Sequence, residues 1–107
     1  MADKQFKIKV GTLRRVKKDL EYYARELTTQ KAKIDKMRAD GKDEYDIKQQ
    51  QEVLVETETM LPDCQTRLRE AAADLEAFIA KNRAEVDGLE LFQEAQTLLA
   101  ATPALLA

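Results

Sequence analysis

The 107-residue chain contains no histidine and no tryptophan, and it has one cysteine, two prolines and three glycines. Without histidine, there can be no Ser-His-Asp or Cys-His nucleophile system, no His-based general acid or base and no His-containing metal site. A single cysteine forms neither an intrachain disulfide nor a thiolate zinc cluster, and it fits a reducing compartment. Sandwiches and barrels need Gly and Pro at their many turns, so their scarcity argues against both folds.

Long apolar stretches are missing as well. The N-terminal residues Met1, Ala2, Asp3 and Lys4 begin no apolar run, so no signal peptide is expected. No stretch of about 18 apolar residues is present that could span a membrane. More than half of the chain is Ala, Glu, Lys, Leu, Arg and Gln, which is the composition of long helices. These features predict a cytosolic, non-catalytic, all-α protein.

Charge is distributed unevenly along the chain. Residues 1–40 carry 12 Lys or Arg against 6 Asp or Glu, whereas residues 41–82 carry 5 against 10 and residues 83–107 carry 1 against 4. We favour a basic helix packed antiparallel beside an acidic helix, because their opposite charges attract. The alternative is that the basic helix docks an acidic partner.

A seven-residue apolar repeat predicts the first helix, over about residues 4–39. One row of the repeat is Leu13, Leu20, Leu27 and Ile34. The other row is Val16, Tyr23, Gln30 and Met37. Two such rows form the seam along which supercoiled helices pack. Gly11 costs this helix about 1 kcal/mol relative to Ala, and we expect it to mark a close contact or a point of fraying.

A second helix is predicted over about residues 44–82, after a break at residues 40–42. Asp43 is its expected N-cap. One row of its seam is Ile47, Leu54, Leu61, Leu68 and Leu75. The other row is Gln50, Thr57, Cys64, Ala71 and Phe78. Because Gln50 and Thr57 are polar, the apolar stripe is narrower in the first half of the helix than in the second.

A third helix is predicted over about residues 89–101, ending before Pro103. Short connections place consecutive helices antiparallel, so it is expected beside the C-terminal half of the second helix and the N-terminal end of the first. Residues 24–60 are then a two-helix pair with these residues near the seam: Gln30, Lys31, Gln50 and Thr57. Pro62 is expected to kink the second helix, the alternative being two helices broken at residues 60–62. The predicted fold is an elongated, antiparallel three-helix bundle that forms one domain over residues 1–107.

Other functional classes fit the sequence poorly. Carboxylates as close in sequence as Glu56 and Glu58 do not face each other on a helix, so we do not expect an enzyme. No Gly-rich loop begins a helix to bind phosphate, and Cys64 falls at a core position. Domains that bind nucleic acid are usually strongly basic, unlike this chain, and the apolar face that could lie on a membrane is needed for the bundle. The sequence therefore predicts a small helical interaction module without metal or cofactor.

Five segments of the second helix carry a specific pattern: Tyr45-Asp46-Ile47-Lys48-Gln49-Gln50, Glu52-Val53-Leu54-x-Glu56-Thr57, Met60-Leu61-Pro62-Asp63-Cys64, Arg67-Leu68 and Asp74-Leu75. A Pro-Asp-Cys run inside a continuous seven-residue repeat is unusual for a generic coiled coil. These segments resemble the tubulin-binding cofactor A family. Two upstream segments are also similar to the family: Lys33-Ile34-Asp35-Lys36-Met37-Arg38 and Lys7-Ile8-Lys9. The similarity runs over residues 4–80.

The resemblance implies a cytoplasmic, cytoskeleton-associated chaperone of three helices that captures β-tubulin released from the chaperonin. It implies that the chain holds β-tubulin near-native until other tubulin-folding cofactors assemble the αβ heterodimer, with no nucleotide, metal or catalytic step. Glu58 and Leu61 depart from the family, which often has a basic residue and Ile there. Residues 100–107 are rich in Ala and Leu where relatives are commonly charged.

The residues expected to bind the partner are the solvent-side members of the family pattern: Tyr45, Lys48, Gln49, Glu52, Glu56, Asp63 and Arg67. Because β-tubulin is acidic, four cations of the first helix are expected to contribute: Arg14, Lys17, Lys18 and Arg25. The alternative for Lys48, Glu52 and Glu56 is that they form only surface pairs four residues apart, worth about 0.2–0.5 kcal/mol each. The alternative for the whole chain is a structural coiled-coil adaptor subunit that self-associates, so monomer and homodimer both stay open.

Overall fold

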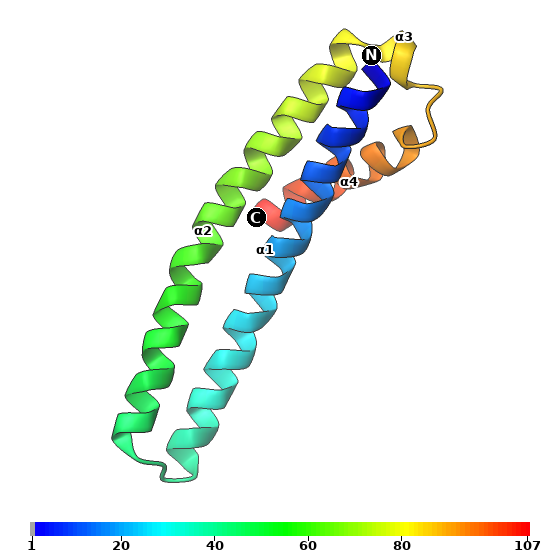
Figure 1. Cartoon of the computed structure of the whole chain (residues 1–107). Coiled ribbons are helices and arrows are strands. Elements are labelled where there is room, and N and C mark those ends of the chain that lie inside the picture. The colour runs from blue at the N-terminus through cyan, green and yellow to red at the C-terminus, as the bar shows by residue number, and fades with distance from the viewer. Residues whose placement is uncertain (1) are drawn as a thin grey trace. The chain divides into compact units, whose positions relative to one another are not determined.

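The computed structural model describes residues 2–107, and every regular element in that range is an α-helix, as predicted (Figure 1). The two long helices are α1, Ala2–Ala39, and α2, Glu44–Lys81. The two short ones are α3, Arg83–Val86, and α4, Phe92–Leu106. The described residues thus form four helices rather than the three expected, because the chain makes one further helical turn, α3, before α4 begins.

The chain divides into two compact units. Unit 1 contains Met1–Leu20 and Cys64–Ala107, and unit 2 contains Glu21–Asp63. Each long helix contributes one segment to each unit. The single domain expected over residues 1–107 stays a prediction.

Unit 1 holds most of the buried apolar side chains: Ala2, Phe6, Val10, Leu13, Val16, Leu20, Cys64, Leu68, Ala72, Leu75, Ile79, Val86, Ala95 and Leu98. Six of them occupy the predicted rows of the repeat: Leu13, Val16, Leu20, Cys64, Leu68 and Leu75. Val10, Ala72 and Ile79 are buried beside those rows, whereas Ala71 and Phe78, predicted in the seam, are half-buried. The rings of Phe6 and Phe78 stack with their centroids 6.4 Å apart. Lys9 Nζ lies 2.7 Å from Asp74 Oδ2 and 5.5 Å from the Phe78 ring centroid. These contacts join the start of α1 to the end of α2, so the two segments are antiparallel within unit 1.

One face of α4 is buried in unit 1. Ala95, Leu98 and Thr102, spaced as neighbours on one side of a helix, are its buried residues. The hydroxyl of Thr102 donates to the carbonyl of Leu98 at 3.0 Å, so this buried polar group is satisfied. α4 therefore presents an apolar strip to the rest of unit 1.

The expected end of the last helix before Pro103 is wrong, because α4 begins at Phe92 and continues to Leu106. Pro103 is exposed and falls in the last turn of the helix. Because Pro103 has no N–H to donate to the carbonyl of Leu99, the helix lacks one backbone hydrogen bond there but can continue to its end.

The first long helix ends in a turn that requires glycine. Gly41 has a φ angle of 68°, in the left-handed region that glycine adopts without strain. The N–H of Lys42 donates to the carbonyl of Met37 at 3.0 Å, and the N–H of Gly41 donates to that of Arg38 at 3.2 Å. These are the two hydrogen bonds of a Schellman C-cap, and they fix the chain reversal inside unit 2.

α2 begins at Glu44 because Asp43 caps it. The carboxylate of Asp43 accepts a hydrogen bond from the N–H of Tyr45 at 3.3 Å, which confirms the predicted N-cap. The helix then continues unbroken through the exposed Pro62 to Lys81. The alternative of two helices broken at residues 60–62 is therefore wrong, while the kink at Pro62 stays a prediction.

Unit 2 is a helical pair with a small buried core. Among its described residues, Ile34 and Thr57 are buried. The other apolar seam residues are only half-buried: Tyr23, Leu27, Met37, Ile47, Leu54 and Leu61. Gln30 and Gln50 are half-buried, and Gln30 Oε1 is a buried oxygen without a hydrogen-bond partner, whereas Lys31, expected near the seam, is exposed. The seam of unit 2 is thus partly polar and partly open to solvent.

Gly11 lies in the middle of a helical segment of unit 1, where the sequence predicted a close contact or fraying. Neither is found, because α1 runs through it and no other side chain lies within 4 Å of where a Cβ would be. The helix also begins at Ala2, slightly earlier than the expected residue 4.

Candidate partner-binding surface

Clusters of three or more His, Cys, Asp or Glu side chains that could hold a metal ion are absent from residues 2–107. In the same range, no helix is long and apolar enough to cross a membrane. Cys64 is buried, in agreement with its expected place in the core. The side chains predicted to bind a partner lie on the surfaces of α1 and α2.

Five of them form one face of α2 in unit 2, which we call the outer face: Tyr45, Lys48, Gln49, Glu52 and Glu56. Steps of three and four residues stack these side chains on one side of the helix. All five are exposed, and among the large apolar residues that the structure describes Tyr45 is the most exposed, at 66%. The seam residues Ile47 and Leu54 occupy the other side of α2.

The charges of the outer face are available to a partner. In the part of the chain that the structure describes, Lys48 lies in no ion pair with Glu52, four residues away. The alternative role of these residues as surface ion pairs is therefore not observed. A partner would not have to break an internal contact in order to reach Lys48, Glu52 or Glu56.

Two valines flank the outer face and were not among the predicted residues. Val53 is 43% exposed and Val55 is 60% exposed. Both fall outside the apolar rows of the repeat, and β-branched residues are not favoured in exposed helix positions. That combination is the sequence signal that could have identified them. Their side chains add apolar area beside the charged side chains of the outer face.

Asp63 and Arg67 lie further along α2, and both are exposed. Asp63 is the last residue of unit 2, whereas Arg67 belongs to unit 1. Each takes part in an interaction within the chain. Arg67 also lines a hollow of about 390 Å³ on unit 1, together with Arg15 and Asp74. These two residues are less available to a partner than the outer face is.

Arg14, which was expected to contact an acidic partner, is paired inside unit 1. Its Nε and Nη2 atoms lie 2.5 and 2.9 Å from the two carboxylate oxygens of Glu94 on α4. Donation of this hydrogen bond lowers the pKa of Glu94, against the desolvation that would raise it, and the charges of Arg14 and Lys18 add to the lowering. The same hydrogen bond raises the pKa of Arg14. Arg14 on α1 therefore forms a bidentate ion pair with Glu94 that joins α4 to α1.

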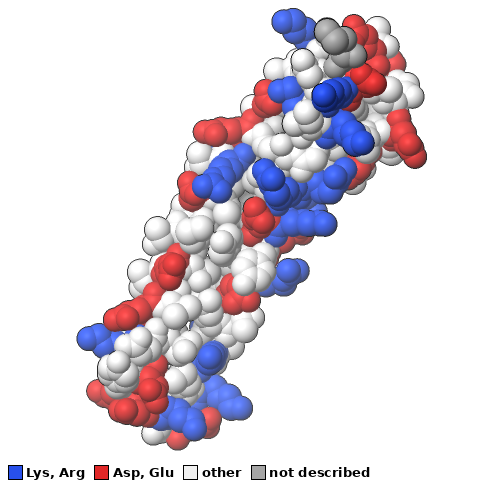
Figure 2. All heavy atoms as spheres, in the orientation of Figure 1, with Lys and Arg blue, Asp and Glu red and all other residues white. Residues whose placement is uncertain are grey.

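The other predicted cations of α1 differ in how accessible they are. Lys17 is half-buried and interacts within the chain, whereas Lys18 and Arg25 are exposed. Lys17 and Lys18 belong to unit 1, and Arg25 belongs to unit 2, as the outer face does. Lys and Arg side chains gather over the N-terminal half of α1 (Figure 2).

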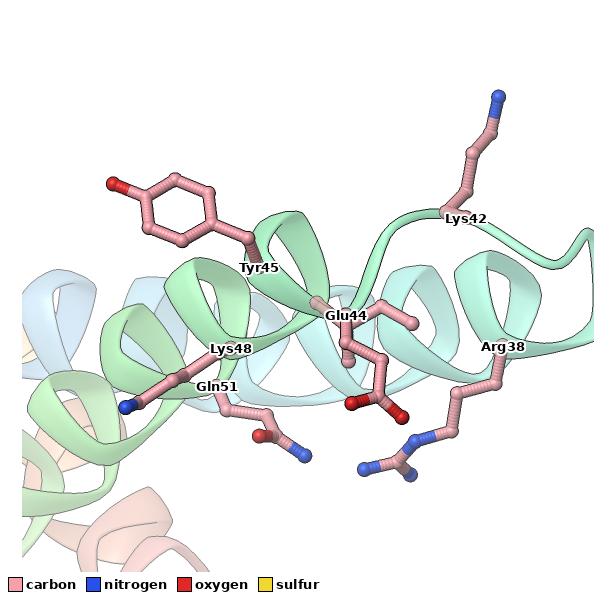
Figure 3. A pocket seen from close by; sticks show the side chains of 7 residues that line it. Arg38, Lys42, Glu44, Tyr45, Lys48 and Gln51 are labelled. Atoms are coloured by element: carbon pink, nitrogen blue, oxygen red, sulfur yellow. The ribbon is translucent and has the colours of Figure 1, made fainter.

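A hollow of about 700 Å³ lies beside the α1–α2 turn in unit 2, lined by Arg38, Lys42, Glu44, Tyr45, Ile47, Lys48 and Gln51. Figure 3 shows the side chains of Arg38, Glu44 and Gln51 extending to one side of the helices, while the Tyr45 ring and Lys42 point to the other. Sequence reasoning identified Tyr45 and Lys48 but missed the rest. The turn itself was the available signal, because a short reversal brings the end of one helix beside the start of the next.

These features define the class of the protein as a helical interaction module, with exposed charged and apolar side chains on paired helices. The sequence pattern described as "Tubulin binding cofactor A" matches residues 1–99, so the chain belongs to that family. This confirms the resemblance that the motifs of α2 predicted.

Relatives and solved structures agree with the family assignment. The tubulin-specific chaperone A of Gallus gallus is 42% identical over 102 residues, which cover 92% of this chain and 94% of that protein. The crystal structure of tubulin folding cofactor A from Arabidopsis thaliana is similar with a TM-score of 0.84 and 34% identity, covering 96% of both chains. A solved β-tubulin binding post-chaperonin cofactor gives a TM-score of 0.76 and 34% identity, covering 95% of this chain and 97% of that one. Because the family consists of chaperones without enzymatic activity, this chain is not an enzyme, as predicted.

Proposed function

We propose that this protein captures β-tubulin after its release from the chaperonin and stabilises it near-native, on the pathway to the αβ-tubulin heterodimer. The observation that carries the proposal is the family match over residues 1–99, supported by similarity to a solved β-tubulin binding post-chaperonin cofactor. The protein acts in the cytoplasm on tubulin destined for the cytoskeleton, and other tubulin-folding cofactors receive its client.

Binding alone is sufficient for this role. A protein that binds the near-native state of a client, and not its unfolded state, shifts the folding equilibrium by mass action. At a free concentration one hundred times the dissociation constant, the shift is about 2.7 kcal/mol. No nucleotide or metal is needed for such a mechanism.

The outer face of α2 is the contact surface that we propose for β-tubulin. It combines unpaired charges with the exposed Tyr45 ring and with the flanking side chains of Val53 and Val55. An exposed aromatic group and apolar area next to charges are typical of protein contact sites. Of the α1 cations, Lys18 and Arg25 remain candidates, since Arg14 is held by Glu94.

Capture of β-tubulin by outer-face variants tests this proposal. Purified chain is mixed with β-tubulin released from the chaperonin, and the complex is quantified by size-exclusion chromatography. Glu56→Lys is expected to weaken capture at least tenfold, because it reverses a charge of the outer face. The matched control is Glu58→Lys, the same change at an exposed residue about 200° away around the helix. Equal capture by the two variants would remove the outer face from the contact surface, and no capture by the unchanged chain would refute the proposed function.

The competing function is a structural coiled-coil subunit that self-associates. Sedimentation equilibrium over a hundredfold range of concentration separates the two functions. The chaperone role requires only that the chain bind β-tubulin, whereas the structural role requires a dimer or larger assembly. A mass that stays monomeric over the whole range contradicts the structural role.

A further inference from the structure

The seam of unit 2 is open along one side, where a groove runs between its two helical segments. Two hollows, of about 700 and 210 Å³, share Arg38 and Gln51 among their lining residues and therefore lie next to each other. The floor of this seam groove is apolar and is made by Ile34, Ile47 and Leu54. Ile34 is buried, while Ile47 and Leu54 are half-buried, so part of the floor faces solvent.

The rim of the seam groove is positively charged. Its cations are Lys31, Arg38 and Lys48, and its carboxylates are Asp35 and Glu44. Within residues 2–107, none of these three cations lies in an ion pair. Lys42 also lines the larger hollow, but it points to the other side of the helices (Figure 3). In Figure 3 the guanidinium of Arg38 extends to the same side as Gln51, which the two hollows share. The groove thus offers an apolar strip between unpaired cations.

In unit 1, the segments of the same two long helices pack against a third helix, α4. There α4 buries Ala95, Leu98 and Thr102, and its Glu94 forms the bidentate ion pair with Arg14 of α1. An amphipathic helix with an acidic residue beside its apolar strip is therefore the element that packs against α1 and α2 within this fold. Unit 2 has no such helix of its own, because Glu21–Asp63 contains only segments of α1 and α2.

We infer that the seam groove binds an amphipathic helix of the client, with acidic residues flanking its apolar face. Charge complementarity favours this occupant, because a basic or uncharged helix would leave the three rim cations unpaired. An amphipathic helix laid into an apolar groove is also a recurrent mode of recognition between proteins. The groove extends from Glu44 to Leu54 along α2, about 15 Å at 1.5 Å per residue, which fits about three turns of helix. The inference rests on the proposed function and identifies the kind of element in the client that is bound.

Two double variants of α1 test the inference. Lys31→Glu with Arg38→Glu reverses two rim cations, whereas Lys33→Glu with Lys36→Glu makes the same charge change at exposed residues that line neither hollow. The probes are folded β-tubulin released from the chaperonin and a set of overlapping 15-residue peptides that covers the β-tubulin sequence. Affinities are measured by fluorescence anisotropy, and circular dichroism melting verifies that both variants fold.

The rim variant is expected to lose at least tenfold in affinity for β-tubulin, and the control variant less than threefold. The peptides that bind the unchanged chain are expected to be acidic and amphipathic, and to lose their binding in the rim variant alone. Equal losses in the two variants, or peptides that are mainly basic, would overturn the inference while leaving β-tubulin capture intact. Self-association of the unchanged chain that disappears in the rim variant would show a second copy as the occupant, which also overturns it. If the unchanged chain captures no β-tubulin, it is the proposed function that fails.

Discussion

At the scale of single residues, the fold depends on a few fully buried side chains and on ion pairs between helices, among them Arg14 with Glu94. Leu68 and Leu75 are entirely buried in unit 1, as are Phe6 and Leu13 on α1. The repeat of the sequence identified Leu13, Leu68 and Leu75, since seam positions can be assigned from spacing alone. Phe6 lies seven residues before Leu13 and so continues the same row. It could not pair Arg14 with Glu94, because these residues are 80 positions apart and no local pattern links them. Arg14, which was expected to bind the partner, thus has a role within unit 1 that the sequence did not reveal.

Truncation of a seam residue is expected to destabilise the protein strongly. Leu68→Ala removes a fully buried side chain and leaves a cavity, so it should lower the free energy of unfolding by about 2–5 kcal/mol. Val55→Ala, at a residue 60% exposed on the same helix, should change it by no more than about 0.5 kcal/mol. Urea unfolding followed by circular dichroism measures both, and similar midpoints for the two variants would contradict the position of the core.

The ion pair between Arg14 and Glu94 predicts a dependence of stability on pH. The pKa of Glu94 is lowered in the folded state. The contribution of its ion pair to the free energy of unfolding is therefore fully present above the ordinary glutamate pKa of about 4.3. That contribution is lost as the pH falls through the lower pKa of the folded state. Both side chains are more than a third exposed, so solvent screening limits the contribution to about 0.2–1 kcal/mol. Glu94→Gln should therefore destabilise at pH 7 and have little effect near pH 2. The exposed Glu76→Gln is the control, and an equal effect of Glu94→Gln at both pH values would show that the ion pair is not its cause.

At the scale of helices, the ends were partly predictable. Asp43 and the glycine turn before it gave the start of α2 and the end of α1, because capping follows local sequence. Pro103 was misleading, since a proline near a helix C-terminus costs only one hydrogen bond. The extra turn α3 was missed because a four-residue helix has no periodicity to detect, and it is held by tertiary burial of Val86. The kink at Pro62 is still to be measured.

Alanine substitution should change the stability of the protein in opposite directions at Gly41, in the turn after α1, and at Gly11, inside α1. Gly41→Ala forces a side chain into the left-handed conformation of the Schellman turn and should cost about 1 kcal/mol. The Cβ that Gly11→Ala adds inside α1 has no neighbour within 4 Å. This substitution should therefore stabilise the protein by about 0.5–1 kcal/mol. Thermal unfolding of the two variants and of the unchanged chain measures the direction of both changes in stability. A loss of stability in Gly11→Ala would mean that this glycine has a contact that the fold does not reveal.

At the scale of the whole molecule, the sequence indicated an all-helical interaction protein, and the family motifs indicated its client. The outer face could be predicted because family motifs and helical spacing both mark it. The seam groove of unit 2 could not be predicted from the sequence, because a groove stays open only where no further helix packs over the two that form it. Unit 1 has the larger buried core and unit 2 the more exposed surface. We therefore expect unit 2, with the outer face and the seam groove, to carry most of the contact with the client.

The central claim is that this chain binds β-tubulin as a folding cofactor, and sedimentation velocity tests it most directly. The labelled chain is sedimented alone, with β-tubulin released from the chaperonin, and with α-tubulin released in the same way. We predict a faster-sedimenting complex that contains the labelled chain with β-tubulin, and none with α-tubulin. Sedimentation of the labelled chain that is unchanged by β-tubulin would contradict the account.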